Sequence, residues 1–191
     1  EMQAILKSYL ESGRATVDNY EFLSECGMML MGNIPLTEAN RPVSQKYFVN
    51  LPDIFKESAL LDRFHGFIEG WHLPRMNKDM VLTGWTLNVE YFSEILHTLR
   101  TAPEYGVLVN ELIVSEEKSD LRDLKAVKRI ATAYGKLLFP HITEISRVNR
   151  GEFERYCLNP AIQKRGVIKA QCHLIDGEFR GEMPVIALRE F

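Results

Sequence analysis

The sequence predicts an α/β portion followed by an all-α portion. A continuous apolar run, "CGMMLMGNIP" at residues 26–35, is typical of a strand that is buried on both faces of a parallel sheet. Residues 89–138 instead carry apolar side chains at helical spacing. The 191 residues can bury one core, or one core and a smaller second one.

The first portion begins with a helical pattern. Its apolar stripe consists of Met2, Ile5, Leu6, Tyr9 and Leu10, and Gly13 is a natural left-handed cap at its end. "ATVDNYEF", at residues 15–22, predicts a short hairpin with Asp18 and Asn19 in its turn. The apolar strand and a polar loop follow. "LPDIFKESALLDRF", at residues 51–64, then predicts a short helix with proline in its first turn.

Three helices are predicted in the second portion, after an irregular segment with several glycines. Asn88 can cap the first, which carries an apolar stripe through Leu99. Residues 102–118 predict the second helix. Ser119 and Asp120 begin the third, whose stripe is Leu121, Leu124, Val127, Ile130, Tyr134, Leu137 and Leu138 and which Pro140 ends. A basic helix over residues 159–175 and a turn at "DGEFRG" complete the chain.

These patterns divide the chain into residues 1–78, the end of an α/β core, residues 79–145, a helical subdomain, and residues 146–191, a basic helical extension or linker. The first helix begins inside its apolar pattern without a capping residue, and "IALREF" ends inside another pattern. We therefore expect the sequence to be a piece of a longer protein.

Composition excludes several classes of protein. The net charge of −3 provides no global basic field, so any contact with nucleic acid has to be local. Three widely separated cysteines without a CxxC motif predict reduced thiols in the cytoplasm, and neither they nor the five histidines show metal-ligand spacing. From that spacing we expect no metal site. The apolar run is too short to cross a bilayer, so we also expect no membrane contact.

Three polar side chains each have a structural and a functional interpretation. Asn33, at the carboxyl end of the predicted strand, either bonds its own backbone or lies at a ligand site. Arg63 either covers the surface, paired with Asp62, or projects toward a phosphate on a neighbouring subunit. Arg122, in a first helical turn, is either neutralised by Asp120 and Asp123 or adds to an anion site.

The sequence contains no recognisable catalytic residue set or phosphate-binding loop. No Ser/His/Asp or Ser/Lys set can be assembled, a Cys172–His173 pair is not brought face to face by adjacency, and no GxxxxGK[ST] phosphate loop occurs. Lys164, Arg165 and Lys169 cluster in the basic tail, where they are candidates for contacting nucleic acid.

The order of these elements resembles the second half of an AAA+ ATPase module of the MCM-like clade. "MMLMGNIP" is similar to a sensor-1 strand, "LLDRF" to an arginine-finger segment, and "LRDLKAVKRIATAYGKLLFP" to a lid helix. More narrowly, "MGNIPL", "FHGFIEGWHLPR" and "VKRIATAYGKLLFP" resemble the BrxL family, the Lon-protease-like ATPases of bacterial BREX phage-defence systems. The resemblance covers nearly the whole chain.

The resemblance implies roles for particular residues. Asn33 takes the sensor-1 position, Arg63 that of the arginine finger, and Arg122 that of sensor 2. The family binds ATP and Mg²⁺ through a phosphate loop and an acidic motif that lie upstream of this segment, so the segment alone is expected to hold neither. The tip of the hairpin, Asp18 and Asn19, is not basic, so contact of the tip with phosphate is not expected. Arg14, at the base of the hairpin, is the nearer candidate for contacting DNA.

The resemblance also implies partners: a homo-oligomeric ring, DNA, and other phage-defence components. A downstream Lon-like domain is expected, while no protease nucleophile can be placed in this segment. Two rival functions stay open, namely an unfoldase that threads polypeptide toward a protease and a non-enzymatic helical module that binds DNA or a partner through its tail.

Overall fold

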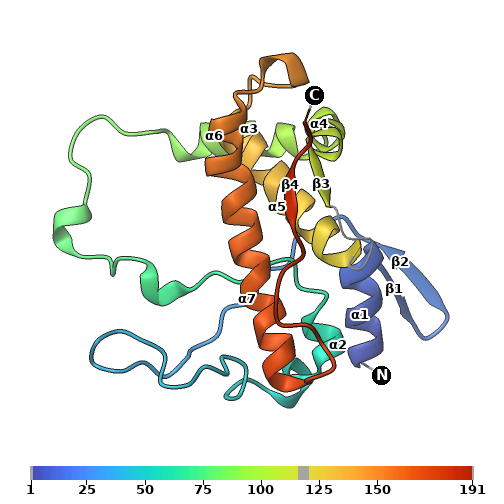
Figure 1. Ribbon diagram of the computed structural model, residues 1–191. Coiled ribbons are helices and arrows are strands. Elements are labelled where there is room, and N and C mark those ends of the chain that lie inside the picture. Colours follow the sequence, from blue (N-terminus) through green and yellow to red (C-terminus); the bar gives the residue numbers. More distant parts are fainter. Residues whose placement is uncertain (1, 116–120, 191) are drawn as a thin grey trace. The chain divides into compact units, whose positions relative to one another are not determined.

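The computed structural model describes residues 2–115 and 121–190, which form helices and two small antiparallel sheets (Figure 1). The chain divides into two compact units. The first unit comprises Glu1–Phe67 and Lys164–Met183, and the second comprises Ile68–Gln163 and Pro184–Phe191. Both units are therefore built from segments far apart in the sequence. The division of the chain into predicted domains 1–78, 79–145 and 146–191 stays a prediction.

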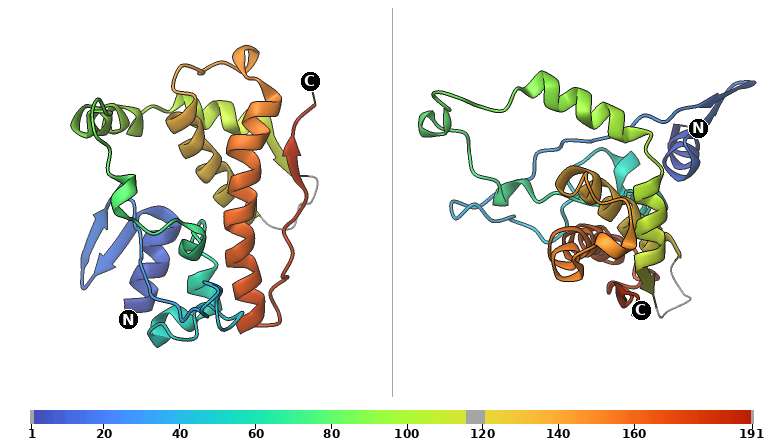
Figure 2. Two further views of the ribbon diagram at one scale, coloured as in Figure 1. Left: turned by 90° about the vertical axis from the view of Figure 1, so that its left-hand side faces the viewer. Right: turned by 90° about the horizontal axis from the view of Figure 1, so that it is seen from above.

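The first unit opens with the predicted helix and hairpin. Helix α1 (Met2–Ser12) ends at Gly13, whose φ of 73° is left-handed, and strands β1 (Arg14–Val17) and β2 (Tyr20–Leu23) pair antiparallel beside it (Figure 2). Asp18 in the turn also has a positive φ, as a tight two-residue turn requires. The prediction of this hairpin is confirmed.

Gly13 is expected to be irreplaceable. A Cβ at this position would lie 2.7 Å from the Ser24 carbonyl oxygen, in a backbone conformation that costs other residues about 1–2 kcal/mol. Gly13→Ala should therefore lower the free energy of unfolding by at least about 1–2 kcal/mol, measured as a urea midpoint by circular dichroism. Gly27→Ala is the matched control, since its Cβ would meet nothing within 4 Å; equal midpoints for the two variants would contradict the prediction.

The core of the first unit forms between residues 47–67 and helix α7 (Asn159–Ile175). A 3-10 helix, η1 (Asp53–Lys56), and the single-turn helix α2 (Ser58–Leu61) replace the one short helix predicted there. Aromatic rings dominate this core: Tyr47 stacks on Phe67 at 5.5 Å between ring centroids, and Phe48 meets the same ring edge-on at 5.7 Å. The buried residues of the cluster are Phe48, Leu61, Ile168 and Cys172.

The predicted buried strand over residues 26–35 is wrong for this structure. The segment has no regular secondary structure, and its apolar side chains are exposed, Met31 being 94% accessible. A strand needs at least one hydrogen-bonded neighbouring strand, and no strand in the described residues pairs with this segment. The apolar composition of the run thus identifies a surface that the described chain leaves uncovered.

The second unit contains the three predicted helices in their predicted places. Helix α3 (Val89–Arg100) is capped by the Asn88 side chain, which accepts a hydrogen bond from the Tyr91 amide at 3.0 Å. Helix α4 (Glu104–Leu112) is shorter than predicted, because the chain continues as strand β3 (Ile113–Ser115). Helix α5 (Leu121–Leu138) ends before Pro140, while its predicted capping residues, Ser119 and Asp120, lie outside the described residues.

The buried face of helix α5 overlaps the predicted stripe only in part, at Val127. Its buried residues are Asp123, Ala126, Val127, Ala131 and Gly135, whereas Leu121 is 79% accessible. Helix α4 and the π-helical turn η5 (Glu154–Leu158) pack on that face. Small side chains allow this close packing, so the centre of the buried face is displaced from the predicted stripe toward Ala126, Ala131 and Gly135.

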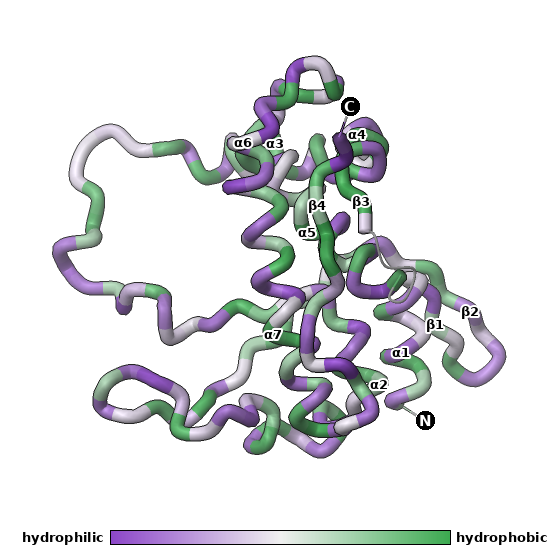
Figure 3. The backbone as a smooth tube through the Cα atoms, in the orientation of Figure 1, coloured by the Kyte–Doolittle hydropathy of each residue, from purple (hydrophilic) through white to green (hydrophobic). Residues whose placement is uncertain are grey.

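The tail, residues 146–191, contributes further elements to the second unit. Helix α6 (Arg150–Phe153) leads through η5 into α7, and strand β4 (Ile186–Leu188) pairs antiparallel with β3. Figure 3 shows β3 and β4 largely in the colour of hydrophobic residues. Three isolated 3-10 turns are η2 (Gly70–His72), η3 (Lys78–Met80) and η4 (Ile145–Arg147). No helix in the described ranges has the length and apolar character to span a bilayer.

Candidate active-site arginine and its support

The segment that carries Arg63 is anchored in the first unit on both sides. Leu60 and Leu61 are fully buried, and Phe64 packs against the core cluster. The Arg63 amide donates to the Leu60 carbonyl at 3.0 Å, and the Phe64 amide donates to the Leu61 carbonyl at 3.0 Å. Since its neighbours are held by the core and by these turns, Arg63 leaves the backbone from a fixed point.

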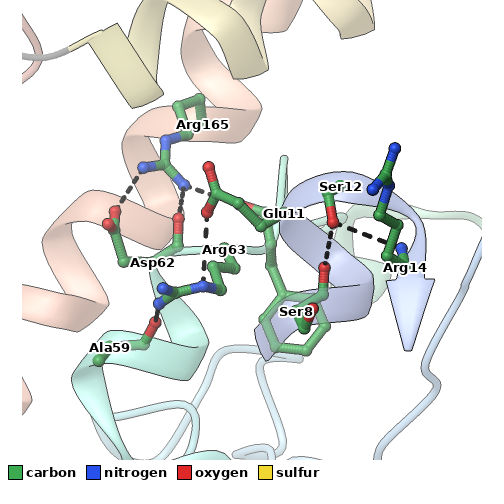
Figure 4. A network of polar contacts seen from close by, with 9 residues as sticks. Ser8, Glu11, Ser12, Arg14, Ala59, Asp62, Arg63 and Arg165 are labelled. Atoms are coloured by element: carbon green, nitrogen blue, oxygen red, sulfur yellow. Dashed lines mark hydrogen bonds and ion pairs between the residues drawn. The ribbon is translucent and has the colours of Figure 1, made fainter. Parts of the chain in front are cut away.

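The side chain of Arg63 is partly buried and has few acceptors. Its Nη1 donates to the Ala59 carbonyl, and its Nε lies 3.4 Å from a carboxylate oxygen of Glu11 on α1 (Figure 4). The Nε atom is buried and makes no hydrogen bond to the described residues. A buried donor without an acceptor costs about 1–3 kcal/mol, so this guanidinium would gain from a better placed anion.

The predicted partner of Arg63, Asp62, forms an ion pair with Arg165. The Asp62 carboxylate accepts from Nη2 of Arg165 on α7 at 2.5 Å. Nη1 of Arg165 also donates to the Asp62 carbonyl at 2.9 Å and to the Phe64 carbonyl at 2.7 Å. Arg165 therefore bonds the main chain on either side of Arg63.

The prediction of a basic surface in the tail is wrong for Arg165 and Lys169. Arg165 is fully buried, Lys169 is 6% accessible, and Lys164 is partly buried. Their helix packs with Ile168 and Cys172 in the core of the first unit. Lysine and arginine at this spacing can lie on either face of a helix, and Arg165 points inward because Asp62 compensates its charge.

The other predicted site residues belong to other segments of the chain. Asn33 is exposed in the irregular segment of the first unit, and Arg122 is partly buried in the first turn of α5 in the second unit. Arg14 is exposed at the base of the hairpin and pairs with Glu21 across the two strands at 3.4 Å. The convergence of Asn33, Arg63 and Arg122 on one nucleotide stays a prediction.

Three partners in the first unit were missed by sequence reasoning. The Gln171 side chain accepts from the Tyr47 amide and donates to the Gln45 carbonyl, both at 2.8 Å. Ser58 donates to Asp176 at 3.1 Å. Glu11 meets Arg63 from α1. These contacts join residues far apart in the chain, and no local motif signals them.

The described residues offer no metal centre, and the thiol of Cys157 is not activated. They contain no group of three or more His, Cys, Asp or Glu residues placed to hold a metal ion, so magnesium ligands do not fit here. Burial raises the pKa of the Cys157 thiol to about 12, which leaves very little of the nucleophilic thiolate at neutral pH.

Comparison with known proteins identifies relatives of the chain. It is 24% identical to the Lon-like protease BrxL of Escherichia coli O9:H4 (strain HS) over 173 residues, or 91% of the chain and 24% of that protein. It is also 24% identical to the Lon-like protease BrxL of Bacillus cereus (strain H3081.97) over 155 residues, or 81% of the chain and 23% of that protein. The chain spans about a quarter of the length of these relatives.

A family match covers almost all of the chain. Residues 1–184 match the ATPase domain of the family described as Lon-like protease BrxL-like. This range includes Asn33, Arg63 and Arg122 together with helix α7, which supports Arg63. The family expected from the sequence is confirmed: the chain belongs to the Lon-like protease BrxL-like family and matches its ATPase domain.

Proposed function

We propose that the chain is part of a ring-forming AAA+ ATPase, here called the parent protein, in which Arg63 stabilises phosphoryl transfer in the nucleotide site of a neighbouring subunit. The family match to an ATPase domain supports this proposal. The parent protein would hydrolyse ATP and act on DNA in phage defence, and its phosphate loop and magnesium ligands would come from outside this chain.

The proposal depends on how Arg63 is held and on what its side chain contacts. Its backbone is anchored, its Nε donor lacks a hydrogen bond among the described residues, and 21% of its side chain remains accessible. In a loose phosphoryl-transfer transition state, charge spreads over the equatorial oxygens, and a planar guanidinium delivered in trans stabilises it. Hydrolysis would then depend on assembly of the ring.

The contact between Arg63 and Glu11 fits this role. The two side chains are 21% and 41% accessible, and a pair that lies near the surface and lacks a hydrogen bond at Nε is worth about 1 kcal/mol or less. A phosphate carries more charge than a carboxylate and accepts charge-assisted hydrogen bonds. Exchange of Glu11 for a neighbour's phosphate would therefore be favourable once two subunits meet.

Asn33 and Arg122 would serve the nucleotide in further ways. In the proposal Asn33 positions the attacking water in its own subunit, and Arg122 contacts the γ-phosphate from the lid. The exposed apolar run before Asn33 would become a sheet strand beside strands from the rest of the parent protein. Each role follows the family resemblance and supplies a separate variant for testing.

DNA contact is the part of the proposal with the least support in this chain. Arg165 and Lys169 are buried, which leaves the exposed Arg14 at the hairpin base. ATP hydrolysis by the parent protein should be stimulated by duplex DNA, in a salt-dependent manner, and not by denatured casein. Stimulation by casein alone would favour the polypeptide unfoldase.

Delivery of Arg63 in trans can be tested by mixing subunits of the parent protein. Arg63→Ala spoils the site of the neighbour, whereas Asn33→Ala spoils its own site. Either variant alone should be inactive. A random equal mixture should recover activity at about a quarter of the interfaces, because only those combine an intact Asn33 with an intact Arg63. A mixture no more active than the pure variants would contradict the proposal.

A further inference from the structure

We infer that Arg165 is the positioning residue of Arg63, so that α7 helps to complete the nucleotide site of the neighbouring subunit. The inference rests on the proposed function of Arg63. It replaces the interpretation of Arg165 as a DNA contact, which its complete burial contradicts.

One guanidinium fixes the main chain around Arg63. Nη1 of Arg165 donates to the carbonyl before Arg63, that of Asp62 at 2.9 Å, and to the carbonyl after it, that of Phe64 at 2.7 Å. Nη2 holds the Asp62 carboxylate at 2.5 Å. Figure 4 shows Arg165 reaching from its helix to Asp62, the residue before Arg63.

Further hydrogen bonds complete the restraint. The amides of Arg63 and Phe64 donate to the carbonyls of Leu60 and Leu61, both at 3.0 Å. Together with the two carbonyls held by Arg165, these bonds restrain three successive peptide planes. Since φ and ψ are the only soft backbone dihedrals, the direction in which the Arg63 side chain leaves the main chain is set.

The anchor itself is rigid. Arg165 is fully buried on a helix whose Ile168 and Cys172 are core residues of the same unit. Its charge is paired with Asp62, and its guanidinium donates charge-assisted hydrogen bonds to the carbonyls of Asp62 and Phe64. A displacement of about 1 Å in a group that stabilises a transition state can cost about 10²-fold in rate.

A buried ion pair is not needed for stability alone. Apolar residues of similar volume often stabilise a core as well as a buried pair does. What apolar residues cannot do is bond the carbonyls on both sides of a particular arginine. The contacts of Arg165 therefore suit the placement of Arg63 better than they suit the filling of the core.

The test is Arg165→Lys in the parent protein. Lysine keeps a positive charge for Asp62 but loses the planar fork that reaches two carbonyls and a carboxylate. We expect kcat for ATP hydrolysis to fall about 10- to 100-fold with KM for ATP unchanged, because Arg63 acts on the transition state of the neighbour's nucleotide. Mixing with Asn33→Ala subunits should restore activity, as is expected for Arg63→Ala.

Ile168→Val is the matched control for destabilisation. It weakens the same core from the same helix, by about 0.5–1.5 kcal/mol, and leaves the hydrogen bonds of Arg165 to Asp62 and Phe64 in place. It should lower the melting temperature and leave kcat unchanged. If Arg165→Lys lowers kcat no more than Ile168→Val does, the inference is overturned.

A double variant separates this inference from the proposed function. Arg63→Ala combined with Arg165→Lys should have the same kcat as Arg63→Ala alone, since Arg165 acts through Arg63. A further multiplicative loss would overturn the positioning role while leaving Arg63 in place. If Arg63→Ala itself leaves hydrolysis unchanged, the proposed function fails instead.

Discussion

Arg63→Ala in the parent protein is expected to lower kcat for ATP hydrolysis by about 10³-fold or more, the range measured for arginines delivered in trans. The physical reason is the loss of a planar cation from the transition state, where charge spreads over the transferring phosphoryl group. Steady-state phosphate release measures the effect. Ring assembly should persist, because the pair with Glu11 that the substitution removes lies within one subunit.

Glu11→Gln is the control that separates catalysis from folding. It removes the charge of the same partner while the guanidinium of Arg63 stays in place, and it should cost at most about 1 kcal/mol of stability. We expect hydrolysis at or above the wild-type rate, because Arg63 loses a competing anion. Equal defects in Glu11→Gln and Arg63→Ala would mean that Arg63 serves only to hold α1.

Of the proposed substitutions, Arg165→Met is expected to reduce stability most, by about 3–5 kcal/mol in the free energy of unfolding. The substitution leaves the Asp62 carboxylate buried without its cation and removes the donors to two main-chain carbonyls. Urea denaturation followed by far-ultraviolet circular dichroism measures the loss. Hydrogen exchange at the Phe64 and Phe67 amides should accelerate, since both lie beside the lost contacts.

A paired substitution tests the electrostatic origin of that loss. Asp62→Leu together with Arg165→Met removes both charges and leaves apolar groups in their place. It should recover most of the lost stability, because no buried charge remains unpaired. If the double variant is as unstable as Arg165→Met, the main-chain hydrogen bonds rather than the ion pair dominate.

Local signals in the sequence predicted the elements that depend on local chemistry. Gly13 ends α1, Asn88 caps α3, and the Asp18–Asn19 turn closes the hairpin, each through atoms only a few residues away. Helix α7 also runs over the predicted residues 159–175. Such features need no knowledge of the rest of the molecule.

Features that depend on distant partners were not predictable. Strand β4 forms because β3 lies beside it, with Ser115 opposite Ile186. The run at residues 26–35 has the composition of a strand but no neighbouring strand in the described chain. The inward direction of Arg165 depends on Asp62, which lies 103 residues earlier. The pattern of amino acids predicts which element forms, whereas contacts with distant residues decide which side of it is buried and what it pairs with.

The dependence of the first unit on α7 has a consequence for biosynthesis. The contacts that hold the segment from Tyr47 to Phe64 reach it from Arg165 and Gln171, more than 100 residues later. At about 5–20 residues per second, the ribosome needs several seconds to make the intervening chain. Throughout that interval the aromatic side chains of the nascent first unit lack their covering helix and are open to chaperones.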